Sequence, residues 1–220
     1  MTVIGITGPT GAGKTTALEI LSEQGFEIVD CDALYYRLLR TDETLRRSLT
    51  AAFGPVFLPD GTLDRRRVAK LVFSDEQALA KLNGIVFPAV YAAVEQKIRK
   101  CSQKGLAIDA INLVESGMGR LCDATVAVTA PPAIRLRRIM ARDGLTEKQA
   151  RARIGAQKPA RWYEENCAFL LENQEEDRDA CQALMRSFFQ NLLEYIVEGD
   201  HGNGSERVER DAPHGEEERL

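Results

Sequence analysis

The chain has 220 residues and a formal net charge of −4, and this length fits one domain of ordinary size. Residues 199–220 hold seven acidic residues against three arginines, so the rest of the chain is neutral overall. A neutral body argues against a general electrostatic grip on nucleic acid, and we expect no nucleic-acid partner.

The chain opens with an apolar run at residues 2–7, followed by a glycine-rich segment at 8–15 and a helical pattern over 14–24. Strand, glycine loop and helix in this order are typical of a P-loop, whose backbone N–H groups and helix N-terminus bind phosphate. We expect ATP and Mg²⁺ here, with Lys14 at the β- and γ-phosphates and Thr15 as a ligand of Mg²⁺. The nucleotide-binding residues expected from the motif are Gly11, Ala12, Gly13, Lys14, Thr15 and Thr16.

The first predicted strand is not preceded by a signal peptide, in which a basic region would be followed by an apolar one. No apolar run in the sequence approaches the roughly 20 residues that span a bilayer. We therefore expect a cytoplasmic protein without a membrane partner.

A second apolar run at residues 26–30 ends at Asp30, and Asp32 follows at the start of a helical pattern over 33–40. The carboxyl ends of strands in open α/β sheets face the ligand crevice. We expect Asp30 to cap the helix and Asp32 to orient an acceptor hydroxyl, accept its proton or organise water around Mg²⁺. The exchange of these two roles is the alternative.

Strand-like and helical patterns alternate along the chain, which indicates right-handed βαβ units. We expect an α/β P-loop NTPase fold of three layers, with a mainly parallel sheet of five strands. A long insertion at 41–104 has helical periodicity and predicts a helical subdomain. The other predicted strands are 106–114, 123–129 and 168–172, and the other predicted helices are 131–142 and 175–197.

Asp109 and Glu115 flank the apolar residues at the end of the third predicted strand. An acid at this place could contact the water shell of the metal, which we consider for Asp109, or the substrate, which we consider for Glu115. Capping of the strand end is the alternative for both residues.

Residues 135–161 form the most basic stretch, and Arg135, Arg138 and Arg142 share one face of the predicted helix. Beside a P-loop, this stretch predicts a mobile lid that brings guanidinium groups onto the transferred phosphate and excludes water. We expect Arg142 and Arg153 to make these contacts. A solvated pair of basic helices is the alternative.

The composition of residues 199–220 predicts a disordered acidic tail. Both histidines lie in this tail, so residues 1–198 contain no imidazole. A proton acceptor in the predicted domain must then be a carboxylate or another group, which excludes Ser-His and Cys-His hydrolase schemes.

An ordered series of motifs over residues 3–175 resembles the dephospho-coenzyme A kinase family. The markers are Ile6 to Thr16, Asp30-Cys31-Asp32, Phe53-Gly54, Asp60 to Arg65, Val72 to Asp75, Leu82-Asn83, Leu113-Val114-Glu115, Arg142 to Thr146, Gln157 and Asn173.

The resemblance implies ATP-dependent phosphorylation of the ribose 3′-hydroxyl of dephospho-CoA, the last step of coenzyme A biosynthesis. It implies one kinase domain at 1–198, in which residues 41–104 hold the CoA moiety and 143–159 form the lid. It also implies that Asp32 is the catalytic carboxylate and that Asn173 binds the nucleotide.

The chain departs from the family pattern on the acceptor side. Phe87 replaces the usual histidine, Ile111-Asn112 replaces Pro-Leu, Tyr36 replaces an arginine, and Ala168 replaces an aspartate. These departures favour two alternatives. One is a P-loop kinase for another small hydroxyl acceptor, such as a nucleoside or nucleotide, and the other is a non-catalytic ATP-binding paralogue.

Overall fold

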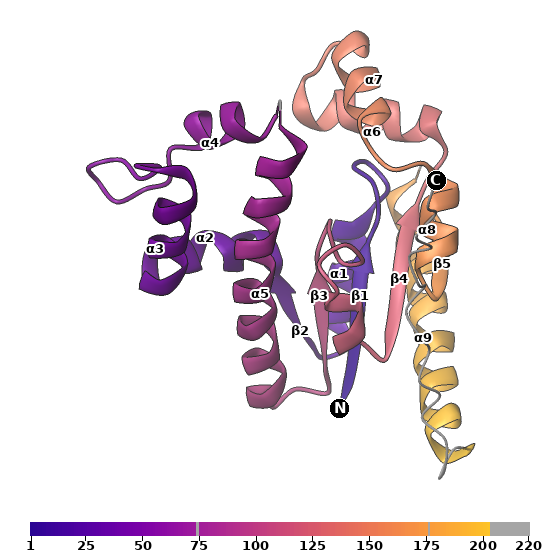
Figure 1. Cartoon of the computed structure of the whole chain (residues 1–220). Helices are drawn as coiled ribbons and strands as arrows, with labels where there is room; N and C mark the ends of the chain where they lie inside the picture. Colours follow the sequence, from indigo (N-terminus) through magenta and orange to yellow (C-terminus); the bar gives the residue numbers. More distant parts are fainter. Residues whose placement is uncertain (74, 176, 203–220) are drawn as a thin grey trace, which may run out of the picture.

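The computed structural model describes residues 1–73, 75–175 and 177–202, and within them five parallel strands form one central sheet (Figure 1). The strand order is β2-β3-β1-β4-β5. The strands are β1 (Thr2–Thr7), β2 (Phe26–Asp30), β3 (Gly105–Asp109), β4 (Ala124–Thr129) and β5 (Phe169–Glu172). The predicted three-layer α/β fold is confirmed, and the described sheet is entirely parallel.

The order of the strands places the end of β1 at the middle of the sheet. Ile6 is in register with Asp109 of β3 on one side and with Val126 of β4 on the other. The chain reaches β2 on one side of β1 and later crosses to β4 on the other side, so the connections diverge at the carboxyl end of β1. A ligand crevice is expected at such a point of an open sheet.

Helices cover both faces of the sheet. The apolar residues Ile20, Met185 and Phe189 of α1 (Lys14–Glu23) and α9 (Arg178–Gly202) pack against Ile4 and neighbouring side chains on one face. On the opposite face, Val94 of α5 (Glu76–Lys100) packs in a cluster with Leu106, Ile108 and Val29. Alternate residues of the buried strands therefore contribute to separate cores.

The predicted helical insertion is confirmed as a set of helices with a core of its own. It is built from the end of α2 (Cys31–Thr41) and from α3 (Glu43–Phe53), α4 (Arg65–Val72) and α5. The residues Leu39, Leu45, Leu49, Val56 and Val68 are its buried centre. Because α2 begins directly after β2, this subdomain lies beside the carboxyl end of the sheet.

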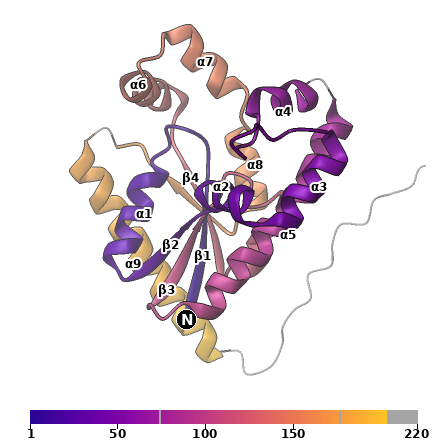
Figure 2. The same cartoon turned by 90° about the vertical axis from the view of Figure 1, so that its left-hand side faces the viewer.

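Three further helices, α6 (Pro132–Asp143), α7 (Glu147–Gly155) and α8 (Ala160–Asn166), follow β4 (Figures 1 and 2). Gly144, with φ 63°, ends α6, and Thr146 begins α7 with a capping box to Gln149. Figure 1 shows α6 and α7 at the same end of the molecule as the loop between β1 and α1.

Two predicted boundaries are wrong. The third strand ends at Asp109 and not at residue 114, because residues 111–117 form turns closed by the bond from Ser116 N–H to the Asn112 carbonyl. Helix α9 continues to Gly202, four residues into the segment predicted as a disordered tail. Residues 203–220 of that segment lie outside the described residues.

Helix α5 is, by length and composition alone, apolar enough to cross a membrane. Lys81 and Glu95 bound the apolar stretch of this helix, so a search for long uninterrupted apolar runs in the sequence does not single it out. The fold gives this composition another use, since α5 contacts α2, α3 and α4 and contributes Val90 and Val94 to the core.

Gly8 and Gly84 differ in the space available for a side chain. Gly8 has φ +132°, and a Cβ there would lie 2.0 Å from the carbonyl oxygen of Val128, whereas a Cβ at Gly84 in α5 would meet nothing within 4 Å. We expect Gly8→Ala to lower the free energy of unfolding by more than about 2 kcal/mol. Gly84→Ala should raise it by about 0.5–1 kcal/mol. Urea unfolding measures both, and equal stability of the two variants would contradict the described path of the loop.

Candidate active site

A cavity of about 670 Å³ lies over the loop between β1 and α1. Gly13, in the left-handed conformation with φ 110°, directly precedes Lys14, the first residue of α1, so the helix N-terminus faces the loop. The residues around the cavity that bear on function are Gly11, Gly13, Lys14, Thr15, Asp109 and Arg142. The structure therefore brings most of the predicted nucleotide-binding residues to one cavity.

Lys14 is folded back onto its own loop. Its Nζ donates to the carbonyl oxygen of Gly8 at 2.6 Å and lies 3.5 Å from that of Pro9. Burial lowers the pKa of the Lys14 ammonium, while the nearby Asp109 carboxylate raises it and the Arg142 guanidinium lowers it. A phosphate at the loop would give this buried ammonium an anionic partner in place of a neutral carbonyl.

Two arginines of α6 bind the outer side of the loop. Arg135 is buried, and its Nε donates to the carbonyl oxygen of Thr10 at 2.9 Å. Arg138 Nη1 donates to the carbonyl oxygens of Gly11 and Ala12 at 3.1 and 3.2 Å. The helical spacing predicted their common face, but it did not reveal that they bind loop carbonyls.

Asn173 binds the backbone of the loop between β1 and α1. Its fully buried side chain donates from Nδ2 to the carbonyl oxygen of Ala12 at 3.0 Å, and a Cβ at Gly13 would lie 2.6 Å from this Nδ2. Ala12 is also fully buried and does not line the cavity, and its N–H donates to the carbonyl oxygen of Pro9 at 3.3 Å. Asn173 holds the loop and does not line the cavity in this conformation, so its contact with the nucleotide stays a prediction.

A second cavity, of about 230 Å³, lies between the helical insertion and the end of β3. The lining residues that bear on function are Asp32, Tyr36, Asn83, Phe87, Ile111 and Asn112. Ile111 also lines the first cavity, so the two cavities meet at this residue. Four of the positions at which the chain departs from the family pattern, Tyr36, Phe87, Ile111 and Asn112, therefore line the same cavity as Asp32.

Asp30, the last residue of β2, and Asp32, in the first turn of α2, have different surroundings. Asp30 caps α2, since its Oδ1 accepts a hydrogen bond from Ala33 N–H at 2.9 Å, as predicted. Asp32 lines the second cavity. Burial and the Asp30 carboxylate raise the pKa of Asp32, and Lys14 lowers it. The partly desolvated Asp32 carboxylate is therefore a better proton acceptor than an ordinary aspartate.

Asp109 is the last residue of β3 and lines the first cavity. Burial raises its pKa, the Lys14 ammonium lowers it, and the carboxylates of Asp30 and Asp32 raise it. Lys14 thus interacts with an acid of each cavity, Asp109 in the first and Asp32 in the second. This arrangement places carboxylates and one cation around the junction of the cavities.

Two predicted substrate contacts lie elsewhere. Glu115 is exposed and lines neither cavity. Burial raises the pKa of Tyr163 and of Cys167, and the charge of Glu115 raises both further. Arg153 also lines neither cavity, because its Nη1 binds Asp143 Oδ2 at 2.5 Å. Neither residue lines a cavity in this conformation, so their direct contacts with substrate stay predictions.

Tyr36 occupies the place of an arginine in the family pattern, and another arginine lies against it. The Arg65 guanidinium, at the start of α4, is 4.1 Å from the centroid of the Tyr36 ring. The positive charge at this edge of the second cavity therefore comes from α4. Sequence reasoning missed this contact because the two residues are far apart along the chain.

The described residues contain no group of three or more His, Cys, Asp or Glu side chains that could hold a metal ion. Mg²⁺ commonly uses one or two protein ligands together with substrate phosphates and water, and does not need an all-protein cage. Thr15 and Asp109 line the first cavity, and Asp32 lines the second cavity beside it. Their oxygen donors fit an ion of this kind bound together with phosphate.

Comparisons with known proteins agree with this geometry. The family model for dephospho-CoA kinase matches residues 2–179. The dephospho-CoA kinase of Moorella thermoacetica is 33% identical over 210 residues, which cover 93% of this chain and 99% of the relative.

Solved structures also match the chain. A crystal structure from Thermus thermophilus superposes with a TM-score of 0.71 at 32% identity and covers 88% of this chain and 97% of that one. A dephospho-CoA kinase from Campylobacter jejuni shares the fold, with a TM-score of 0.54 at 19% identity over 87% of this chain and 97% of its own. The site geometry, the matched family model and the full-length relative together show that this chain belongs to the dephospho-CoA kinase family.

Proposed function

We propose that the protein transfers the γ-phosphoryl group of ATP to the ribose 3′-hydroxyl of dephospho-CoA, the last step of coenzyme A biosynthesis. The observation that carries this proposal is the meeting of two cavities at Ile111, with Lys14 in one and Asp32 in the other. Membership of the dephospho-CoA kinase family supports the same reaction.

ATP binds with its phosphates on the P-loop. The backbone N–H groups of the loop and the N-terminus of α1 bind the β- and γ-phosphates, and Lys14 leaves the Gly8 carbonyl to reach them. Arg142, which lines the same cavity, stabilises charge on the transferred group. Thr15, with Asp109 or Asp32 acting through water, would hold Mg²⁺, which would neutralise charge on the phosphates.

Dephospho-CoA binds with its ribose at Asp32. The aromatic and apolar side chains of Tyr36, Phe87 and Ile111 give this cavity a wall suited to a planar base, and Asn83 and Asn112 offer polar groups. Asp32 accepts the proton of the 3′-hydroxyl as the bond between this oxygen and the γ-phosphorus forms. The bond from the γ-phosphorus to the bridging oxygen breaks, and ADP leaves.

The proposal is tested by ADP release with MgATP and each of several acceptors: dephospho-CoA, adenosine, guanosine and adenosine monophosphate. Dephospho-CoA should give the highest kcat/KM, and phosphorus NMR of the product should show the new phosphate on the 3′-oxygen. Faster turnover of a nucleoside or nucleotide would favour a different acceptor. ATP binding without any acceptor-dependent release of ADP would favour a non-catalytic paralogue.

The two aspartates after β2 provide a matched pair of variants. Asp32→Asn should lower kcat at least about 100-fold with ATP binding retained, because the proton acceptor is lost. Asp30→Asn should keep kcat within about threefold, since asparagine also caps helices well. Steady-state kinetics and calorimetric titration with ATP measure both quantities. A larger loss in Asp30→Asn than in Asp32→Asn would exchange their roles.

The pH dependence follows from the environment of Asp32. Burial and the nearby Asp30 carboxylate raise the pKa of Asp32 above its ordinary value of 3.8. A base acts only when deprotonated, so kcat/KM should fall as the pH drops through this raised pKa and recover above it. The residual activity of Asp32→Asn should lack this acid limb. An unchanged limb in the variant would assign it to another group.

A variant of Phe87 tests whether the second cavity binds the acceptor. Phe87→Ala should raise KM for dephospho-CoA roughly tenfold and leave KM for ATP unchanged, because the removed ring lines only the second cavity. Phe73→Ala is the control, since this phenylalanine is 89% exposed and lines neither cavity. Equal effects of Phe87→Ala on both KM values would contradict the separation of the two substrates.

A further inference from the structure

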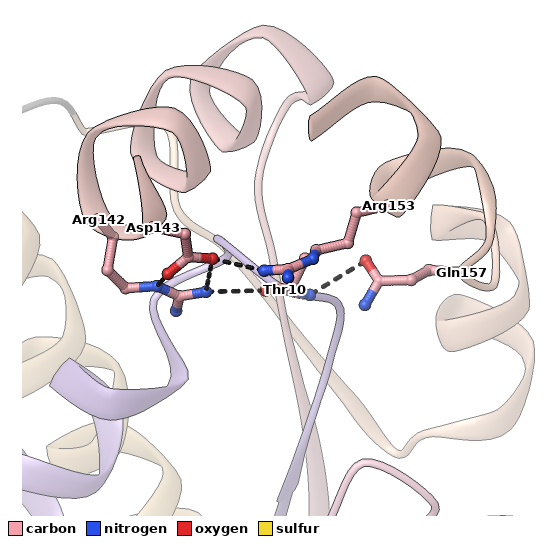
Figure 3. A network of polar contacts seen from close by, with 5 residues as sticks. All are labelled: Thr10, Arg142, Asp143, Arg153 and Gln157. Carbon is pink, nitrogen blue, oxygen red and sulfur yellow. Dashed lines mark hydrogen bonds and ion pairs between the residues drawn. The ribbon is translucent and has the colours of Figure 1, made fainter. Parts of the chain in front are cut away.

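Asp143 binds two guanidinium groups at the turn between α6 and α7 (Figure 3). Its Oδ1 accepts from Arg142 Nε at 2.7 Å, and its Oδ2 accepts from Arg142 Nη2 at 3.0 Å. Arg153, in the last turn of α7, donates to the same Oδ2 from Nη1 at 2.5 Å. One carboxylate thus joins the end of α6 to the end of α7.

The contact with Asp143 uses only the Nε and Nη2 edge of the Arg142 guanidinium. Arg142 lines the nucleotide cavity, and within residues 1–73, 75–175 and 177–202 its Nη1 has no hydrogen-bond partner. Its Nη2 also donates to Thr10 Oγ1 at 3.3 Å. The paired Nε and Nη2 atoms fix the plane of the guanidinium, and Nη1 is left for a ligand.

Thr10 is itself held on both sides by residues beyond the loop. Its N–H donates to Gln157 Oε1 at 3.1 Å, and its carbonyl accepts from Arg135 Nε at 2.9 Å. Gln157 Oε1 also accepts from Arg135 Nη2 at 2.6 Å. Arg142 therefore has two supports, Asp143 within the helical pair and Thr10 in the P-loop.

The second arginine changes the charge of the cluster. An isolated pair of Arg142 and Asp143 would be neutral and would attract a phosphate weakly. Arg153 restores a net charge of about +1 to the cluster when the carboxylate is ionised. Hydrogen bonds from Arg142 and the charges of both arginines lower the pKa of Asp143, which keeps it ionised at neutral pH.

We propose that Asp143 is a positioning residue of the reaction, which orients Arg142 towards the phosphates of ATP, and that Arg153 compensates its charge. This inference rests on the proposed function. It assigns Arg153 a role through Asp143 in place of direct contact with substrate. It also makes the turn at residues 142–144 part of the catalytic apparatus and not only a connection between helices.

Two rival roles for Asp143 predict different measurements. If Asp143 only stabilises the helical pair, its loss lowers the free energy of unfolding and leaves the kinetics of the folded enzyme unchanged. If Asp143 competes with phosphate for the arginines, its loss tightens ATP binding. Positioning predicts weaker ATP binding together with a lower kcat.

The experiment compares wild type with Asp143→Asn, an isosteric change, and with Arg153→Gln. Asp143→Asn should lower kcat about tenfold and raise the Kd for ATP about threefold, and Arg153→Gln should lower kcat about threefold. The controls are Glu147→Gln and Arg151→Gln, an exposed ion pair of α7 at 2.7 Å, which should stay within twofold of wild type. Steady-state kinetics and calorimetric ATP titration provide the readouts.

A double variant shows whether Asp143 acts through Arg142. In an Arg142→Ala background, adding Asp143→Asn should lower kcat by less than about twofold, because the group that it orients is gone. A further tenfold loss would overturn the proposal, and so would unchanged kinetics or tighter ATP binding in Asp143→Asn alone.

The two proposals fail in different ways. If dephospho-CoA does not stimulate ADP release by the wild-type protein, the proposed function fails. The effect of Asp143 on ATP affinity is still measured in that case, because the calorimetric titration contains no acceptor, and an unchanged Kd in Asp143→Asn would overturn the positioning role.

Discussion

The active site depends on hydrogen bonds that hold the carbonyl groups of the P-loop from outside. Arg135 binds the carbonyl of Thr10, and Arg138 binds those of Gly11 and Ala12. Because the C=O and N–H of a trans peptide unit point in opposite directions, a carbonyl held outward turns the following N–H inward. Burial lowers the pKa of Arg135, and hydrogen bonds to the loop and to Gln157 offset this cost of desolvation.

The same helix carries the loop supports and the arginine that we propose to act on phosphate. Arg135 and Arg138 bind the loop, and Arg142, one turn further along α6, lines the nucleotide cavity. Through Asp143, Arg142 is joined to α7. A movement of α6 relative to the sheet would therefore change the loop and the phosphate contact together, which is how a lid could couple closure to catalysis.

Local patterns predicted most of the fold. The P-loop and the capping role of Asp30 depend on contacts within a few residues, so the sequence shows them directly. The end of β3 was mispredicted because the apolar residues after Asp109 form turns. The end of α9 was mispredicted because residues 199–202 share the polar composition of the segment that follows. Within the site, sequence spacing grouped the arginines correctly. Whether each arginine faces a carbonyl, a carboxylate or the cavity depends on atoms far away in the chain, so the spacing did not reveal these contacts.

The central claim is that one substrate occupies each cavity and that the two meet at Ile111. A crystal structure with dephospho-CoA and a non-hydrolysable ATP analogue bound together tests this most directly. We predict the γ-phosphate of the analogue within hydrogen-bond reach of Lys14 and Arg142, and the ribose 3′-oxygen within reach of Asp32. A ribose bound away from Asp32, with its 3′-oxygen turned from the γ-phosphate, would contradict the account.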